Sequence, residues 1–99
     1  MILGKVIGTV WSTKKDENLV GAKFLIVRQL DLDYKPQKNF VVAVDSVGAG
    51  VSEVVLVAQG SSARQTTFTK NKPVDAVIMA IVDKLDIAIK DKLEELIES

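Results

Sequence analysis

The sequence predicts an all-β protein, a small five-stranded barrel followed by a C-terminal amphipathic helix. Three observations lead to this fold class. Short apolar runs rich in β-branched residues alternate with turns that contain glycine, as in chains built from short strands. The 99 residues can enclose one hydrophobic core and therefore one domain. A sheet this small cannot hide its edge strands, and closing it into a barrel removes them.

The first two strands are expected over residues 2–12 and 19–29. Residues 2–12 alternate imperfectly between apolar and polar positions, and Gly4 and Gly8 interrupt the pattern. Glycines inside a strand often mark a bulge or a barrel corner, where the chain bends and a neighbouring backbone comes close. A polar, charged loop then leads to the second strand, which is apolar and β-rich through Phe24 to Val27.

Two further strands follow an exposed connection over residues 30–39. Residues 40–44 form an apolar run that is too short for a typical helix, and it is followed by the turn Gly48-Ala49-Gly50. Residues 53–59 repeat the apolar pattern, and Gly60 opens a long polar loop after them. This arrangement predicts a third strand, a tight corner and a fourth strand.

Residues 74–83 are apolar almost throughout and fit either a buried strand or a buried helix, because periodicity does not separate the two. The β-branched residues in this segment favour a fifth strand. Five strands and one short helix in a chain of this length make a barrel of the oligonucleotide-binding (OB) type the leading candidate.

Residues 85–99 differ in kind from the strands, because apolar side chains recur at three- and four-residue spacing and charged residues fill the other face. The apolar positions are Leu85, Ile89, Leu93, Leu96 and Ile97. The pattern predicts an amphipathic helix over 85–99, appended to a barrel domain over 1–84. The helical pair Asp86 and Lys90 contributes only about 0.2 to 0.5 kcal/mol, so docking must supply most of the stability of the helix.

The composition disfavours several partners and sites. Lys plus Arg and Asp plus Glu both total 13, and this neutral balance speaks against nucleic acid or anionic lipid as a partner. The chain has no Cys and no His, which excludes the common zinc sites, and we expect no cofactor. The apolar content of 47% and the mean hydropathy of +0.22 favour apolar surface buried between subunits.

The start of the chain reads as a strand rather than as a targeting segment. Residues 1–11 show no basic region before the apolar stretch and no convincing cleavage site, and Lys5 and Thr9 interrupt the stretch. We therefore expect a cytoplasmic protein with no membrane association.

Catalytic groups are hard to nominate. Ser61, Ser62 and Thr67 carry hydroxyl groups, but no His is present to act as the usual base. Four carboxylates are better explained by loop hydrogen bonds or solvated strand ends: Asp31, Asp33, Asp75 and Asp83. The glycines at 48 and 50 match no phosphate-binding loop and are interpreted as a steric turn. We therefore predict that the protein is not an enzyme.

Six sequence blocks, occurring in order between residues 4 and 83, resemble the pentameric vertex proteins of bacterial microcompartments. That family is known from carboxysomes and from ethanolamine- and propanediol-utilising compartments. The blocks are GKVIGTVW (4–11), LVGAKFLIV (19–27), AVDSVGAG (43–50), EVVLV (53–57), GSSAR (60–64) and PVDAVIMAIVD (73–83).

The resemblance implies an OB-like barrel that has lost nucleic-acid binding and forms a homopentamer capping the vertices of a polyhedral shell. The expected partners are further copies of the chain and the hexameric shell proteins, and the expected location is the microcompartment shell in the cytoplasm. By this analogy Gly60, Ser61, Ser62, Ala63 and Arg64 lie near the ring axis. The two serines then line a narrow central opening, and Arg64 braces the contact between subunits.

The turn Gly48, Ala49 and Gly50 is included with these residues as a candidate for the pore or the subunit interface. The helix over 85–99 is expected to pack against a neighbouring subunit. Two alternatives stay open at this point. In the first, Ser61 and Ser62 only form hydrogen bonds with backbone groups of their own loop. In the second, the barrel is an OB-type binding module for an oligonucleotide or a protein, a role that usually needs a basic groove and aromatic stacking platforms.

Overall fold

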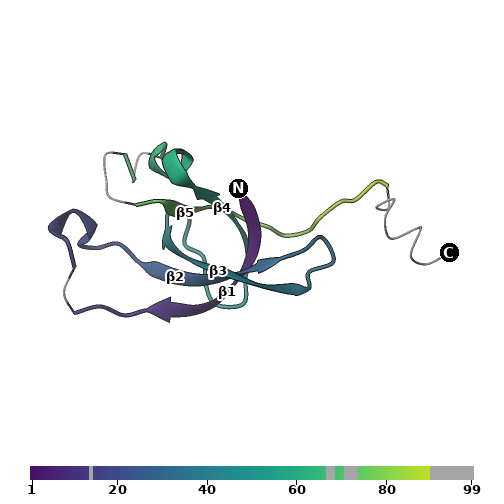
Figure 1. The fold of residues 1–99 in the computed structure, drawn as a ribbon, viewed down its shortest axis with the longest axis horizontal. Helices are drawn as coiled ribbons and strands as arrows, with labels where there is room; N and C mark the ends of the chain where they lie inside the picture. Colours follow the sequence, from purple (N-terminus) through teal and green to yellow (C-terminus); the bar gives the residue numbers. More distant parts are fainter. Residues whose placement is uncertain (14, 67–68, 71–73, 90–99) are drawn as a thin grey trace.

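The computed structural model describes residues 1–13, 15–66, 69–70 and 74–89, and its strands form a closed barrel (Figure 1). The order around the barrel is β1-β2-β3-β5-β4. The strands are β1 (Ile2–Val10), β2 (Phe24–Leu30), β3 (Pro36–Asp45), β4 (Val54–Gln59) and β5 (Ala76–Ile81). The predicted five-stranded all-β barrel is confirmed, and residues 74–83 supply its fifth strand rather than a helix.

A short parallel seam closes the barrel. Neighbouring strands are antiparallel except β3 and β5, which pair in parallel at only two positions, Val44 with Val77 and Asp45 with Ile78. The first part of β3 pairs with β2 alone, so that the β2–β3 hairpin extends beyond the barrel, toward the right in Figure 1.

Two short 3-10 helices lie in the loops, η1 (Glu17–Leu19) between β1 and β2 and η2 (Gly60–Arg64) after β4. The second strand was predicted to start at residue 19 and begins instead at Phe24. The preceding residues are taken up by η1 and by a turn at Gly21, whose φ of +86° suits glycine. A run of apolar residues therefore does not by itself mark where a strand starts.

The third strand begins at Pro36, four residues before the predicted start at Phe40. Its first residues are polar and exposed, so that they carry no alternating pattern. The guanidinium of Arg28 donates hydrogen bonds to the carbonyls of Gln37 and Lys38 at 3.3 and 3.1 Å, next to an irregularity in the β2–β3 pairing. A side chain from the partner strand thus helps to hold a segment that lacks the usual strand signal.

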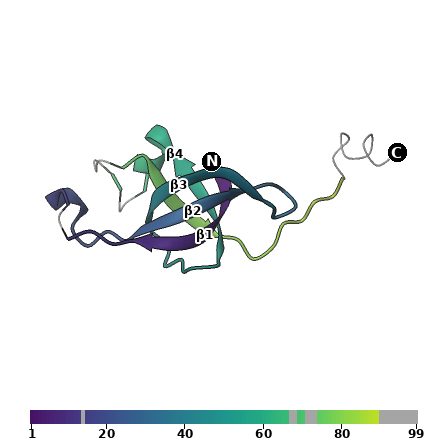
Figure 2. The ribbon, with the colours of Figure 1, turned by 60° about the horizontal axis from the view of Figure 1, so that its bottom comes forward.

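The helix predicted over 85–99 is not supported. Residues 82–89 contain no helix and run away from the barrel, as the yellow-green segment in Figures 1 and 2 shows, and residues 90–99 lie outside the described part of the chain. A helix of this length gains little from local interactions and depends on a docking surface. The described part of the segment leaves the barrel and so finds no such surface on its own subunit. Within the described ranges, no helix is long and apolar enough to cross a membrane.

Two apolar clusters stabilise the fold. The barrel interior contains Val6, Leu25, Val27, Ala43, Ala49, Val55, Val57, Ala76 and Ile78. A second cluster brings the end of β3 together with β4, β5, η2 and the segment before β5: Ala22, Val44, Ala58, Ala63, Val74 and Val77. The second cluster therefore fixes η2 against the strands.

Gly4 occupies a point of close approach inside the barrel. A Cβ atom added to this residue would overlap Cγ1 of Val27 and would lie 2.8 Å from the carbonyl oxygen of Arg28. The same addition at Gly8, beside the irregularity in the β1–β2 pairing, would meet only Cδ1 of Ile26 at 3.5 Å, an ordinary contact. The two glycines therefore serve the two roles expected of them, close approach and bulge.

We predict that Gly4→Ala lowers the free energy of unfolding by about 1–3 kcal/mol, the usual cost of forcing a methyl group into a packed core. Gly8→Ala is the matched control and should change stability by less than about 0.5 kcal/mol. Denaturant unfolding at equal protein concentration measures both. Equal stability of the two variants would contradict the assigned close approach.

Candidate subunit interface

The segment Gly60–Arg64 forms η2 and presents its polar residues outward. Ser61 and Ser62 are exposed, whereas Ala63 is fully buried in the second apolar cluster. The guanidinium of Arg64 donates a hydrogen bond to the carbonyl of Val74 at 3.0 Å. Within one subunit this contact ties η2 to the segment before β5 and so fixes the orientation of both serines.

A small hydroxyl network holds the chain after η2. Thr69 is buried, and its hydroxyl donates to the carbonyl of Ala63 at 2.6 Å and contacts the hydroxyl of Thr66. The backbone N–H of Thr69 also donates to the Thr66 hydroxyl at 2.9 Å. Thr67, a nominated hydroxyl, lies outside the described residues.

The turn containing Gly48, Ala49 and Gly50 is organised by two carboxylates. One Asp45 oxygen accepts hydrogen bonds from three consecutive backbone N–H groups, those of residues 47, 48 and 49, each at 3.1 Å. Glu53 accepts from the N–H of Gly50 at 2.7 Å. Gly48 has a φ of +78°, and Ala49 is buried in the barrel core. The turn therefore closes one end of the barrel with the side chain of Ala49, and the two carboxylates hold its backbone in place.

The structure separates the two predicted site segments. The turn 48–50 precedes β4 and η2 follows it directly, so they lie at opposite ends of that strand. Figure 1 places η2 at the top of the barrel and the β3–β4 turn at the bottom. Six residues of strand span about 20 Å. The two segments therefore do not form one site within the subunit.

The four carboxylates considered for catalysis do not converge either. Asp31 organises the β2–β3 turn by accepting hydrogen bonds from the backbone N–H groups of Asp33 and Lys35. Asp75 and Asp83 flank β5 at its two ends, and both are exposed. No group of three or more potential metal-ligating residues occurs among the described residues.

An apolar surface lies on the outer side of β2 and β3. Leu25 and Val27 point into the barrel, whereas the alternate residues Phe24 and Ile26 lie on the opposite face. The β3 partner of Ile26 is Val42, which is 44% exposed, and the next outward residue is Phe40, which is 59% exposed. We call Phe24, Ile26, Phe40 and Val42 the outer apolar face.

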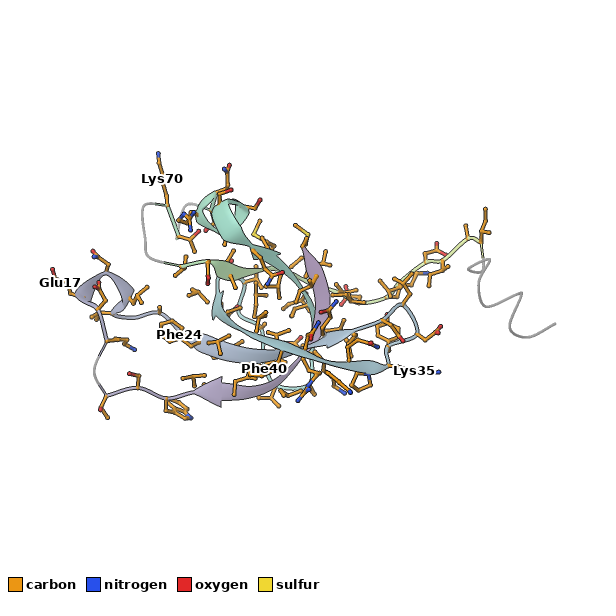
Figure 3. The ribbon with its side chains drawn as sticks, in the orientation of Figure 1. Glu17, Phe24, Lys35, Phe40 and Lys70 are labelled. Carbon is orange, nitrogen blue, oxygen red and sulfur yellow. The ribbon has the colours of Figure 1, made fainter. Side chains whose placement is uncertain are left out.

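Cations border this face. Nζ of Lys15 lies 5.6 Å from the centre of the Phe24 ring, and the guanidinium of Arg28 lies 6.0 Å from the centre of the Phe40 ring. Figure 3 labels both phenylalanines. An apolar centre with a polar rim is typical of protein–protein interfaces.

Sequence reasoning missed the outer apolar face. The signal was the unbroken run of residues 40–44, because a strand with one solvated face alternates whereas a strand covered on both faces does not. This run was interpreted only as a strand, and what covers its outer face was not considered. Trp11, just past β1, is a further large apolar side chain that is exposed.

The sequence and the barrel both match a known family. A family model described as "Ethanolamine utilisation protein EutN/carboxysome" matches residues 1–83. The chain belongs to this family. The match spans all five strands and both predicted site segments.

Two members of the EutN/CcmL family illustrate the sequence similarity. The chain is 47% identical over 88 residues to the carboxysome shell vertex protein CcmL of Synechocystis sp., covering 89% of this chain and 88% of that protein. It is 49% identical over 86 residues to the microcompartment shell vertex protein GrpN of Rhodospirillum rubrum, covering 87% of this chain and 97% of GrpN.

Solved structures in the family have the same fold. The CcmL structure from Nostoc sp. superposes with a TM-score of 0.86 at 43% identity, over 89% of this chain and 93% of that one. The GrpN structure, described as a pentameric microcompartment shell protein from Rhodospirillum rubrum, gives a TM-score of 0.81 at 46% identity, over 89% of this chain and 100% of the GrpN chain.

We predict that Asp45→Ala destabilises the subunit by about 1–3 kcal/mol, because backbone N–H groups in the β3–β4 turn lose their acceptor. Asp33→Ala, which removes an exposed carboxylate from the tip of the β2–β3 hairpin, serves as the control and should have little effect. Thermal unfolding of both variants at one concentration measures the difference. A wild-type melting temperature for Asp45→Ala would show that the turn does not depend on this carboxylate.

Proposed function

We propose that this chain is a shell vertex protein, of which five copies form a closed ring that caps a vertex of a polyhedral bacterial microcompartment. The observation that carries the proposal is the outer apolar face, on which the single subunit leaves Phe40 and Val42 exposed. Relatives named as shell vertex proteins and the pentameric GrpN structure support the number of copies. The proposed location is accordingly the shell of a microcompartment in the bacterial cytoplasm.

The physical role of such a ring is geometric. A flat layer of hexameric tiles cannot close on itself, and units with five-fold symmetry introduce the curvature that closure requires. A contact between two different surfaces of the same subunit generates a ring when its rotation closes. We propose hexameric shell proteins as the partners around the ring.

This role requires no catalytic group and no nucleic acid. The hydroxyl groups of Ser61 and Ser62 have no histidine base in the sequence. The nominated carboxylates lie in the β2–β3 turn and beyond the two ends of β5. Formal net charge is zero, whereas binding to single strands needs a basic groove. We therefore favour a structural protein over an OB-type binding module.

We further propose that η2 faces the ring axis, so that Ser61 and Ser62 line a central opening. The support is that both serines are exposed while Ala63 and Arg64 anchor the segment from behind. The turn 48–50 then lies away from that opening, at the other end of β4, and any role of this turn in subunit contacts is a separate one.

Native mass spectrometry tests the ring. Five chains of 10.8 kDa give an assembly of about 54 kDa. We predict that Val42→Asp shifts the assembly to monomer, because burying an unpaired carboxylate in an apolar contact costs several kcal/mol. Val51→Asp is the matched control, since Val51 is also exposed but belongs to the β3–β4 turn. Dissociation of both variants, or of neither, would argue against the outer apolar face as the contact surface.

Cysteine crosslinking tests whether η2 faces the ring axis. The chain contains no cysteine, so Ser62→Cys introduces a single thiol. We predict that a short bismaleimide joins neighbouring subunits of this variant, because five copies of residue 62 surround a narrow opening. Val51→Cys, at the opposite end of β4, should give no such product. Denaturing electrophoresis reads the result, and equal crosslinking of both variants would reject the assignment of η2 to the axis.

A further inference from the structure

After β5 the chain leaves the barrel as an arm, residues 82–89, which we call the C-terminal arm (Figure 1). The arm begins with a hydrogen bond from the N–H of Val82 to the carbonyl of Val54 at 2.8 Å. Toward its end Ile87 and Ile89 are 49% and 82% exposed. The family model matches residues 1–83, so most of the arm lies beyond the part of the chain that this model describes.

A tyrosine sets the direction of the arm. The hydroxyl of Tyr34 accepts a hydrogen bond from the N–H of Leu85 at 3.1 Å. Tyr34 has a φ of +62°, which is unusual for a bulky residue. The turn tolerates this backbone because Asp31 accepts hydrogen bonds from the N–H groups of Asp33 and Lys35 at 2.8 and 2.9 Å. The hairpin tip is thus built so that Tyr34 holds the arm.

A shallow depression of about 110 Å³ lies at the other end of the subunit. Its lining consists of Phe24, Val42, Val44, Val74, Asp75 and Ala76. A cavity of about 150 Å³ holds benzene, so this space suits one branched aliphatic side chain. The depression shares Phe24 and Val42 with the outer apolar face and is therefore continuous with the proposed subunit contact.

The arm cannot reach the depression of its own subunit. Leu85 is held at Tyr34, beyond the end of β2, whereas Phe24 stands at the start of β2. Figure 3 shows Phe24 on the left and the arm on the right, beyond Lys35. The seven residues of β2 span about 20 Å. The four residues that follow Leu85, up to Ile89, extend at most about 14 Å beyond it.

We propose that the C-terminal arm docks in this depression on a second copy of the chain, with Ile87 or Ile89 as the anchoring side chain. The inference rests on the proposed ring and names a contact within it. Both isoleucines are exposed in the single subunit, so either side chain is available to a neighbouring copy. Since arm and depression lie at opposite ends of one subunit, each copy gives its arm to the next, and such a head-to-tail contact can close into a ring.

Two single-cysteine variants of the full chain test the arm. Ile89→Cys places a thiol on the arm, and Asp75→Cys places one at the depression. The two are coexpressed and oxidised, and the disulfide-linked pair is identified by mass spectrometry of its peptides. We expect abundant disulfide linkage between position 89 of one copy and position 75 of another. Coexpression of Ile89→Cys with Val51→Cys is the control and should give at least about tenfold less linkage.

Adding Tyr34→Phe to the Ile89→Cys and Asp75→Cys pair tests the hydrogen bond between Tyr34 and the arm. This change removes the hydroxyl acceptor and keeps the aromatic ring, so linkage should fall by about fivefold, the factor that corresponds to one ordinary hydrogen bond. Unchanged linkage would reject the role of Tyr34. The melting temperature of the barrel should stay the same.

Native mass spectrometry separates the two proposals. Rings of five with linkage no greater than in the Val51→Cys control would overturn the arm contact and leave the shell function standing. Monomers alone would overturn both, because the arm would then have no neighbour. Rings with specific linkage between positions 89 and 75 support both.

Discussion

A barrel has only one interior, and this constraint governs the rest of the structure. Along β3 the alternate residues Val41 and Ala43 face the core, whereas Phe40 and Val42 face outward and stay exposed in the single subunit. Fully burying side chains of this kind stabilises by about 1.5–3 kcal/mol each. The part of the chain that the structure describes supplies no second layer over these two side chains. Another copy of the protein is therefore the natural source of it.

The positions of the surfaces bear on which assembly forms. A two-fold dimer brings one patch of a subunit against the same patch of its partner, whereas a ring needs two different surfaces on each subunit. This subunit is polarised along its strands: Phe24 and the depression lie at one end, and the hairpin tip with the arm lies at the other. Such an arrangement favours head-to-tail contacts. The short β3–β5 seam contributes indirectly, because it leaves the hairpin free to extend beyond the barrel.

The sequence predicted the barrel well because its strands carry local signals. Gly4 and Gly8 marked a close approach and an irregularity in pairing, and the turn at residues 48–50 marked a corner. The start of β3 could not be predicted, because residues 37–39 are polar on both faces and Arg28, from the preceding strand, donates hydrogen bonds to the carbonyls of Gln37 and Lys38. The helix predicted over 85–99 is not supported for a different reason. Helical periodicity states which residues would share a face, but only a docking surface decides whether the helix forms.

The loops of the candidate interface are held by hydrogen bonds within the subunit. Asp45 holds three backbone N–H groups of one turn, and Arg64 and Thr69 hold η2 through the carbonyls of Val74 and Ala63. These polar groups satisfy the subunit's own backbone rather than a ligand. Ordering a loop at the moment of association costs free energy, and a loop already ordered avoids that cost. In the proposed ring, each loop that the subunit already holds in place leaves more of the apolar contact energy for association.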